Sequence, residues 1–221
     1  MVNEDTGGLR REAAPSAVAP RAPIPLLGRP FVYLRHGETT SNRDAVIAGS
    51  LDVELTPLGR EQARQAGERL ARLARRHGLA FAPIVSSNRQ RAIETARIVA
   101  QALEQAPEGI LHLPDLDERC WGALEGRPRS ERRADALPAD LETIDAFIAR
   151  VSRGLAAIPM PAAGCLPLVA AHSGVWRVLC RLIGIQATAA PIGNAMPMRI
   201  SPSRSRSASP SPSDGWRVEA I

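Results

Sequence analysis

Hydrophobic residues fall into two patterns along the chain, short continuous runs and longer stretches with helical spacing, which alternate from Phe31 onward. The short runs predict buried strands, at residues 31–34, 84–85, 166–171, 196–200 and 216–220, with a further short strand at 110–113. The stretches with helical spacing predict helices, at residues 57–77, 88–106, 141–156 and 175–182. Strands that alternate with helices imply an α/β fold, a three-layer αβα sandwich with a mostly parallel central sheet.

The first of these helices has recognisable ends and a predicted apolar face. Thr56 is a typical N-cap, and Gly78 favours a stop at the other end. Leu58 begins the apolar stripe that we expect to face the core. Glu68 and Arg72 are one turn apart, which predicts an ion pair on the outer face.

Two segments of biased composition lie outside this pattern. Residues 1–29 are rich in Ala, Pro and Arg without periodicity, which is typical of a flexible N-terminal leader. Residues 30–221 then form a single domain. Within it, the Ser/Pro/Arg-rich segment 201–213 has low complexity and is most simply a loop between the last two strands.

The charge of the chain suggests nucleic-acid binding at first sight, but its distribution argues against that function. The formal net charge is +5 and the pI is near 10.3. All 28 basic residues are arginines, and they are scattered among Glu and Asp, which is typical of solvated helix faces. Aromatic residues make up only 3%, too few for a base-stacking surface. We therefore expect no nucleic-acid partner.

The spacing of the cysteines and the hydropathy of the chain indicate the cellular compartment in which we expect the protein. The three cysteines are widely spaced and form no C-x-x-C motif, which fits buried thiols in a reducing environment. No apolar segment resembles a signal peptide, and no run is long enough to cross a membrane. We expect a cytoplasmic protein without a membrane partner, and the sequence indicates no oligomeric state.

Two predicted strands end in histidine and glycine, and these ends carry the candidate chemistry. Arg35-His36-Gly37-Glu38 follows the first strand, and His172-Ser173-Gly174 follows the strand at 166–171. Because parallel strands present their carboxyl ends at one edge of the sheet, the two histidines are expected to face each other. Imidazole is a possible nucleophile and guanidinium matches a phosphate, so the arrangement predicts attack on phosphorus. His77 and His112 keep a structural interpretation.

These residues belong to a larger set of blocks through which the chain resembles the histidine phosphatase superfamily, which includes cofactor-dependent phosphoglycerate mutases and the bisphosphatase acting on fructose 2,6-bisphosphate. The resemblance covers about residues 31–194 and implies a phosphoglycerate mutase-like fold and a catalytic domain over residues 30–221. The matching blocks, in the family's order, are Arg35-His36-Gly37-Glu38-Thr39 with Asn42; Leu55-Thr56, Gly59, Gln62 and Ala63; Ser86-Ser87, Arg91-Ala92 and Thr95-Ala96; Leu116, Glu118, Gly122 and Glu125-Gly126; and Ala171-His172, Gly174-Val175 and Arg177.

The resemblance implies a role for each candidate residue. His36 would attack phosphorus in its neutral form and become a phosphohistidine, with nearby arginine charge holding its pKa down. Glu118 would be the general acid and then the base; its structural alternative is an ion pair with Arg119. The phosphoryl oxygens would be bound by Arg35, Asn42, Arg91, His172 and Ser173. No carboxylate–histidine cluster has metal-ligand spacing, so we expect neither a metal nor another cofactor.

Four further residues are given secondary interpretations. Arg89 stands where the family commonly has an apolar residue, and it either reaches toward an anionic substrate or lies in solvent. Ser173 replaces a usual glycine; it adds a hydroxyl, but a loop with positive φ would be strained there. Glu38 is expected to orient its loop and Glu125 to pair with an arginine.

Three functions remain open at this level. The span from Glu118 to His172 is short, whereas the mutases of the family carry a longer insertion there that covers the site. An open pocket favours hydrolysis, so the first choice is a phosphatase acting on phosphomonoesters of small metabolites, its only expected partner. The runner-up is phosphoglycerate mutase-type phosphoryl transfer. A non-catalytic phospho-ligand binding protein is the third choice, disfavoured because all five catalytic-site residues of the family are present.

Overall fold

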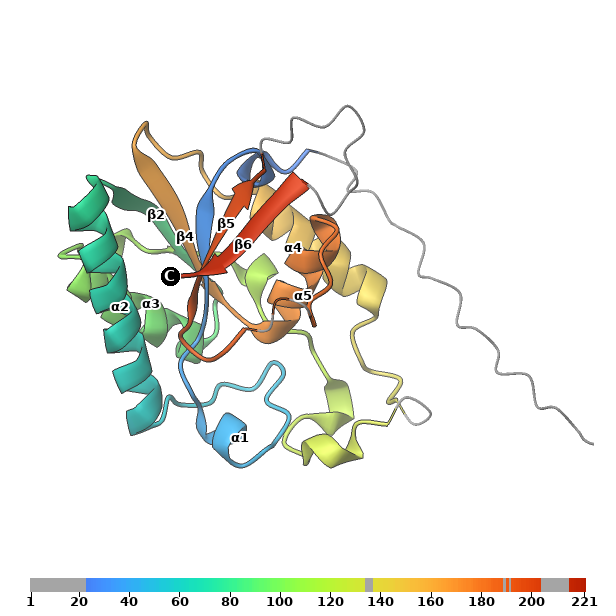
Figure 1. Cartoon of the computed structure of the whole chain (residues 1–221). Coiled ribbons are helices and arrows are strands. Elements are labelled where there is room, and N and C mark those ends of the chain that lie inside the picture. Colours follow the sequence, from blue (N-terminus) through green and yellow to red (C-terminus); the bar gives the residue numbers. More distant parts are fainter. Residues whose placement is uncertain (1–22, 134–136, 189, 191, 204–214) are drawn as a thin grey trace, which may run out of the picture.

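The centre of the fold is a six-stranded sheet, drawn in the computed structural model of Figure 1, which describes residues 23–133, 137–188, 190, 192–203 and 215–221. The strand order is β3-β2-β4-β1-β5-β6. The first four strands in this order run parallel, and β5 and β6 are antiparallel additions at one side. The strands span Phe31–Arg35 (β1), Ala80–Ser86 (β2), Leu111–His112 (β3), Cys165–Ala171 (β4), Pro197–Pro202 (β5) and Trp216–Ala220 (β6).

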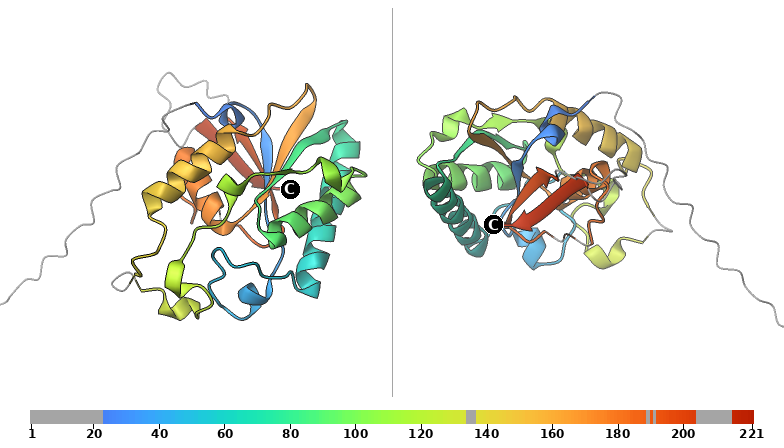
Figure 2. Two further views of the ribbon diagram at one scale, coloured as in Figure 1. Left: turned by 180° about the vertical axis from the view of Figure 1, so that it is seen from behind. Right: turned by 45° about the horizontal axis from the view of Figure 1, so that its top comes forward.

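Helices cover both faces of this sheet. In Figure 1, α2 and α3 lie on one side of the strands and α4 and α5 on the other, and Figure 2 shows the same layers from behind. The predicted three-layer αβα sandwich with a mostly parallel sheet is therefore confirmed. The α-helices span Thr40–Arg43 (α1), Pro57–His77 (α2), Gln90–Ala102 (α3), Ile144–Ala156 (α4) and Ser173–Leu182 (α5). Short 3-10 helices span Pro25–Gly28 (η1), Pro107–Gly109 (η2), Pro114–Leu116 (η3), Gly122–Leu124 (η4) and Arg129–Glu131 (η5).

The pleat of each central strand divides the core into two clusters. Along β1, Phe31 and Tyr33 join the cluster beneath α4 and α5, whereas Val32 and Leu34 join the cluster beneath α2 and α3. All four side chains are fully buried. Successive strand residues point to opposite faces, so a continuous apolar run is what a sheet covered on both sides requires.

Helix α2 confirms the predicted caps but not the predicted side-chain contacts. The Thr56 hydroxyl accepts a hydrogen bond from the Gly59 amide, and Gly78 ends the helix with a φ of 60°. Leu58, however, is 53% exposed, because the first turn of the helix extends beyond the sheet. Arg64 bonds both Glu61 and Glu68, so the ion pair of Glu68 is made with Arg64 and not with Arg72.

Two other helices are shorter than predicted. Helix α3 begins at Gln90 instead of residue 88 and ends at Ala102, shortly before Glu104, whose φ of 57° does not continue a helix. Helix α4 begins at Ile144 because the hydroxyl of Thr143 caps it by accepting from Ala146. Leu141 therefore belongs to the preceding segment, where it packs on a small separate cluster of Ile47, Trp121 and Leu124.

The predicted leader over residues 1–29 is too long at its C-terminal end. Residues 1–22 lie outside the described residues. Ile24 and Leu26 are 8% and 1% exposed and belong to the core cluster beneath α4 and α5. Burying side chains of this size contributes roughly 1.5–3 kcal/mol each, so the ordered domain begins before residue 30.

The predicted loop over 201–213 is also too long at its start. Ser201 and Pro202 belong to β5 and pair with Arg217 and Trp216 of β6. Residues 204–214, which make up most of the predicted loop, lie outside the described residues. None of the helices in the part of the chain that the structure describes is long and apolar enough to cross a bilayer.

Candidate active site

The two strand-end histidines lie side by side at the carboxyl edge of the sheet. Strands β1 and β4 are parallel neighbours with Arg35 opposite Ala171, and the His36 amide donates to the Ala171 carbonyl over 3.0 Å. The rings of His36 and His172 are consequently 5.3 Å apart between centroids. The register of two buried strands thus produces the predicted juxtaposition.

These strand ends open into a cleft of about 960 Å³. Helix α1 and the segment that carries η4 and η5 lie at the same end of the molecule (Figure 1), and a bridge between Val46 and Pro128 joins their loops. Of the candidate residues, those that line the cleft are Arg35, His36, Asn42, Arg91, Glu118 and Ser173. His172 is fully buried behind this lining, against His36.

His36 is held in one tautomer by its own loop. Its Nδ1 lies 2.7 Å from the carbonyl oxygen of Gly37, and a carbonyl only accepts, so Nδ1 carries the proton. The lone pair of the imidazole is therefore on Nε2. Burial lowers the pKa of His36 well below its usual range, and the charges of Arg91 and Arg35 lower it further. The structure thus presents a neutral, oriented imidazole.

The loop after His36 depends on close approach of two backbones. A Cβ on Gly37 would collide with the carbonyl oxygen of Gly59, and a Cβ on Gly59 would collide with that of Glu38. The Gly37 amide donates to the Thr95 hydroxyl over 3.0 Å. The loop after His36 is thereby fixed against α2 and α3.

His172 is oriented by Ser87. The Ser87 hydroxyl accepts from the Arg89 amide and is hydrogen-bonded to His172 Nε2 at 2.7 Å. If Ser87 is the donor in this pair, the ring proton of neutral His172 is on Nδ1, which has no hydrogen-bond partner within the described structure. Burial lowers the pKa of His172 well below its usual range, followed by the effects of Arg91 and His36.

A buried arginine, Arg91, and a half-buried arginine, Arg35, stand beside the histidines. Arg91 is 1% exposed and donates to the carbonyls of Leu51 and Gly49 over 2.7 and 2.8 Å, so it also holds that loop. Arg35 donates over 3.3 Å to the Ile192 carbonyl, and its Nε has no partner among the described residues. Burial lowers the pKa of both groups, but a guanidinium stays charged in proteins.

Glu118 also lines the cleft, and the first residues of α5 bind its carboxylate. Its Oε2 accepts from the Gly174 amide over 3.1 Å and from the Ser173 hydroxyl over 3.4 Å. The first turn of a helix stabilises a carboxylate in this position. The alternative ion pair with Arg119 is not formed, because the Arg119 guanidinium donates to the Glu142 carbonyl instead.

Asn42 completes the set. Its Oδ1 accepts from the Thr39 amide over 3.2 Å and from Asn194 Nδ2 over 3.0 Å. The NH₂ group of Asn42 is therefore the part left to donate into the cleft. Asn194 also donates to the His36 carbonyl over 3.0 Å, which links it directly to the loop of the candidate nucleophile.

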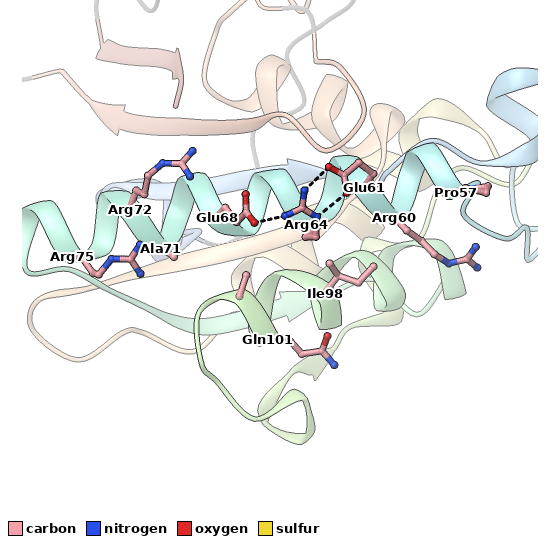
Figure 3. A pocket seen from close by; sticks show the side chains of 11 residues that line it. Pro57, Arg60, Glu61, Arg64, Glu68, Ala71, Arg72, Arg75, Ile98 and Gln101 are labelled. Carbon is pink, nitrogen blue, oxygen red and sulfur yellow. Dashed lines mark hydrogen bonds and ion pairs between the residues drawn. The ribbon is translucent and has the colours of Figure 1, made fainter.

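A second hollow, of about 1020 Å³, runs between α2 and α3 but lacks this chemistry (Figure 3). It is lined by paired charges, with Arg64 bound to both Glu61 and Glu68 (Figure 3), and by small or apolar residues such as Ala71 and Ile98. No histidine, serine or cysteine lines it. We therefore place the candidate active site at the strand-end cleft.

The family model described as histidine phosphatase superfamily (branch 1) matches residues 31–206 of the chain. The chain belongs to the histidine phosphatase superfamily. The resemblance predicted from the sequence blocks is thus confirmed.

Relatives within the superfamily include both mutases and phosphatases. An Arabidopsis thaliana protein named phosphoglycerate mutase-like protein 4 is 34% identical over 164 residues, which cover 67% of this chain and 68% of the relative. A 2,3-bisphosphoglycerate-dependent phosphoglycerate mutase of Thermobifida fusca is 38% identical over 110 residues, 48% of this chain but only 41% of the mutase. The solved structure of a mycobacterial glucosyl-3-phosphoglycerate phosphatase is 26% identical with a TM-score of 0.62, covering 87% of this chain and 97% of the phosphatase.

Several secondary interpretations of this member of the superfamily are corrected by the structure. Arg89 neither reaches the cleft nor lies free in solvent, because its guanidinium pairs with Asp117 at 2.6 Å and donates to the Ser50 carbonyl. Ser173 is the first residue of α5 and has no positive φ, so the expected strain is absent. Glu125 pairs with no arginine in the described structure; it accepts from Ser50 and from the Trp121 amide.

The expectations for Glu38 and His112 are confirmed. Glu38 orients its loop, since its Oε1 accepts from the Thr56 hydroxyl over 2.8 Å. His112 is bonded to Ser86 at the sheet edge, outside the cleft. The three cysteines are free thiols, but only Cys180 is buried as expected, since Cys120 and Cys165 are partly exposed. Among the described residues, no group of three or more His, Cys, Asp and Glu side chains is placed to hold a metal ion.

The sequence analysis did not identify the residues that lie behind the candidate active site or at the rim of its cleft. Tyr33 accepts from the His172 amide and donates to its carbonyl, at 3.0 and 2.6 Å. Its position two residues before Arg35 was a signal, because residues two apart in a strand point to the same face of the sheet, and His172 lies on that face. Arg119, Arg129, Arg132 and Arg177 line the cleft from other elements, and the excess of arginine in the sequence gave no means of singling them out.

The burial of two neutral histidines makes a prediction about acid stability. Their pKa values are depressed in the folded state and near 6.5 in the unfolded state, so the unfolded chain binds more protons below pH 6.5. The contribution of the two neutral histidines to the free energy of unfolding is therefore fully present above pH 6.5. It decreases as the pH falls from there toward the pKa values of the folded state. The expected loss is up to about 1.4 kcal/mol per pH unit for each histidine that stays neutral.

Urea unfolding of the wild type and the double variant His36→Gln/His172→Gln between pH 7.5 and 5.5 measures this effect. The free energy of unfolding should decrease less steeply with falling pH in the double variant. His77→Gln, which removes an exposed histidine, should keep the wild-type slope. Equal slopes in all three proteins would contradict the depressed pKa values.

Proposed function

We propose that this protein is a phosphatase that hydrolyses phosphomonoesters of small metabolites through a phosphohistidine formed on His36. The observation that carries the proposal is the hydrogen bond from His36 Nδ1 to the Gly37 carbonyl, 2.7 Å long, which leaves Nε2 as the nucleophile beside Arg35 and Arg91. The positive charge of the cleft attracts a dianionic phosphoryl group. A neutral imidazole then attacks this group without first losing a proton.

The reaction would proceed in two displacements. In the first, His36 Nε2 bonds to phosphorus, the bond from phosphorus to the ester oxygen breaks, and Glu118 in its protonated form donates its proton to that oxygen. In the second, the Glu118 carboxylate takes a proton from water, whose oxygen bonds to phosphorus while the phosphorus–nitrogen bond breaks. Inorganic phosphate leaves, and neutral His36 and protonated Glu118 are restored.

The remaining candidates would stabilise the transferring group. Arg35 and Arg91 supply full positive charge, and the NH₂ group of Asn42 supplies a further donor. The unpartnered Nδ1 of His172 is accounted for if it donates to a phosphoryl oxygen, since a buried polar group without a partner is costly. The Ser173 hydroxyl acts through Glu118, to which it is bonded.

Hydrolysis is preferred to transfer for two reasons. The span from Glu118 to His172 lacks the long insertion that covers the site in the family's mutases. In the same kind of sequence comparison, the Thermobifida mutase is matched over 41% of its length, whereas a Bacillus subtilis protein named as an uncharacterized phosphatase is matched over 72% of its length. The mutase remains the second candidate because the matched part is 38% identical to that mutase.

A trapping experiment tests the proposal. Wild-type protein mixed with p-nitrophenyl phosphate and quenched in alkali within milliseconds should carry one phosphoryl group, located on His36 by tandem mass spectrometry. A panel of phosphorylated metabolites should then give inorganic phosphate. Phosphate release without a phosphohistidine would overturn the mechanism.

The same panel separates the alternatives. Exchange of the phosphoryl group between phosphoglycerates, activated by a bisphosphorylated primer, would identify a mutase. Binding of phosphomonoesters by calorimetry with neither release nor exchange would identify a non-catalytic binding protein.

A further inference from the structure

One arginine that does not line the cleft binds the backbone of the segment that carries Glu118. Arg150 lies on α4, and its Nη1 donates to the carbonyls of Asp115 and Asp117 over 3.1 and 3.0 Å. Its Nη2 donates to the carbonyl of Glu118 itself over 3.4 Å. The carbonyls of Asp117 and Glu118 belong to the two peptide groups that flank the Cα of Glu118. Arg150 therefore fixes the backbone on both sides of this Cα, and with it the direction in which the side chain leaves the chain.

Glu142 orients this guanidinium and also binds the segment that carries Glu118. Its carboxylate accepts from Arg150 Nε over 2.9 Å and from Arg150 Nη2 over 2.8 Å, a two-point pair that holds the guanidinium in one plane. Its Oε2 also accepts from the Cys120 amide over 3.2 Å. The two side chains are 20% and 16% exposed, so water and salt screen the pair little. The pair thus ties α4 to the chain before and after Glu118.

Helix α4 packs closely against the same segment. A Cβ on Gly154 would come within 2.8 Å of the Leu116 side chain, so the helix and η3 meet at short range. Phe147, which lines the cleft, lies beside Gly174, where an added Cβ would be 3.2 Å from its ring. The Gly174 amide is the group that binds the Glu118 carboxylate. Helix α4 therefore contacts both the segment that carries Glu118 and the residue that binds its carboxylate.

The next arginine on α4 shows that these contacts are particular to Arg150. Arg153 is also joined to this segment, through an ion pair with Asp115 at 3.2 Å, but its side chain is 64% exposed. Within the described part of the chain, Arg153 donates to neither of the peptide groups that flank Glu118. The two arginines thus make the same connection between elements, and only Arg150 binds the backbone next to the candidate acid.

We propose that Arg150, oriented by Glu142, is a positioning residue that places the Glu118 carboxyl group for proton transfer to the leaving oxygen. Arg150 holds the base of this side chain and the Gly174 amide holds its tip, so two fixed points determine where the carboxyl group lies. A misplacement of about 1 Å costs up to about 10²-fold in rate. The inference rests on the proposed phosphatase function and adds to it a residue that touches no substrate.

The dependence of the rate on the leaving group tests this role. The ratio of kcat/KM for glycerol 3-phosphate to that for p-nitrophenyl phosphate reports acid catalysis, because only the alkoxide needs a proton. Arg150→Lys should lower this ratio about tenfold or more, because an ammonium group cannot bind Glu142 at two points and both carbonyls together. In a Glu118→Gln background, Arg150→Lys should change the ratio less than twofold, since no acid is left to place. An equal decrease in both backgrounds would assign Arg150 a general structural role and overturn the inference.

Two further variants separate positioning from folding. Arg153→Lys is the matched control on the same helix and should keep the ratio within twofold. Loss of folded protein lowers both rates by one factor, so an unchanged ratio in Arg150→Lys would overturn the inference and leave the proposed function standing. Arg150→Ala, where circular dichroism shows that it folds, should regain at least about threefold in the ratio when guanidinium ion is added. The same addition should restore nothing when Glu118→Gln is also present.

An amide resonance separates this inference from the proposed function. If the wild type hydrolyses neither ester, the phosphatase proposal fails, and the position of the Glu118 carboxylate is still measurable. The Gly174 amide donates to this carboxylate over 3.1 Å, so its proton resonance in isotope-labelled protein reports the contact. Arg150→Lys should move this resonance toward its position in Glu118→Ala, whereas Arg153→Lys should leave it in place. A Gly174 resonance that Arg150→Lys leaves at its wild-type position would overturn the inference by itself.

Discussion

His36→Ala is expected to lower kcat for phosphomonoester hydrolysis by about 10⁴-fold or more, the largest effect of any single substitution in the cleft. The variant removes the atom on which the phosphoenzyme forms, and no other imidazole takes its place. His172 stands 5.3 Å away between ring centroids, but its Nε2 is bonded to Ser87 and its ring is fully buried. Stopped-flow detection of phosphate with p-nitrophenyl phosphate measures the loss.

Two comparisons make this result specific. His77→Ala removes an exposed histidine at the end of α2 and should leave kcat within twofold. His36→Ala itself should still bind vanadate or inorganic phosphate, because Arg35 and Arg91 remain in the cleft. Phosphate release that survives in His36→Ala would contradict the mechanism. Loss of both activity and anion binding would indicate a collapsed cleft, and a rotamer-preserving His36→Asn variant would then repeat the test.

The central part of this site was predictable because it depends on strands. The apolar runs that end at His36 and at His172 are continuous, which places both strands inside a sheet covered on two faces. Parallel neighbours share one carboxyl edge, so two histidines at equivalent ends must meet there. Arg91 was assigned to the pocket by the resemblance, and the structure places it in the lining of the cleft at the start of α3.

The rim was not predictable because it depends on the paths of loops. Arg132 and Trp121 are eleven residues apart in a segment without periodicity, and their contact at 4.0 Å follows from how that segment folds over the cleft. Arg89 shows the same limit, since its partners Asp117 and Ser50 come from two separate loops. Side-chain pairing between loops has no sequence period from which it can be predicted.

The predicted boundaries of elements were wrong where a polar capping residue, or contact with a core cluster distant in sequence, determines the boundary. Thr143 caps α4 by accepting from the Ala146 amide, so the helix begins at Ile144, three residues after the predicted start. Leu26 is buried by contact with a cluster beneath helices that lie more than a hundred residues further along the chain. Hydropathy averaged over a window detects neither effect.

Glu118→Gln is expected to separate the two half-reactions of the proposed mechanism. The amide keeps the shape of the carboxyl group and an oxygen that accepts from the Gly174 amide, but it neither donates a proton to a leaving alkoxide nor takes one from water. With glycerol 3-phosphate, kcat should fall by about 10²–10⁴-fold. With p-nitrophenyl phosphate, whose phenolate leaves without protonation, the first turnover should remain fast while water attack is slow.

Rapid mixing distinguishes these steps. Glu118→Gln should release a burst of p-nitrophenol equal to the enzyme concentration, followed by slow turnover, and the phosphohistidine on His36 should accumulate during that burst. Glu131→Gln is the matched control, because it removes a carboxylate that is exposed and paired with Arg127 outside the cleft lining. A Glu118→Gln variant that turns over both substrates at the wild-type rate would exclude Glu118 as the acid. A variant slow on glycerol 3-phosphate without a burst on p-nitrophenyl phosphate would assign it to positioning Ser173 and Gly174 instead, since those are the groups it binds.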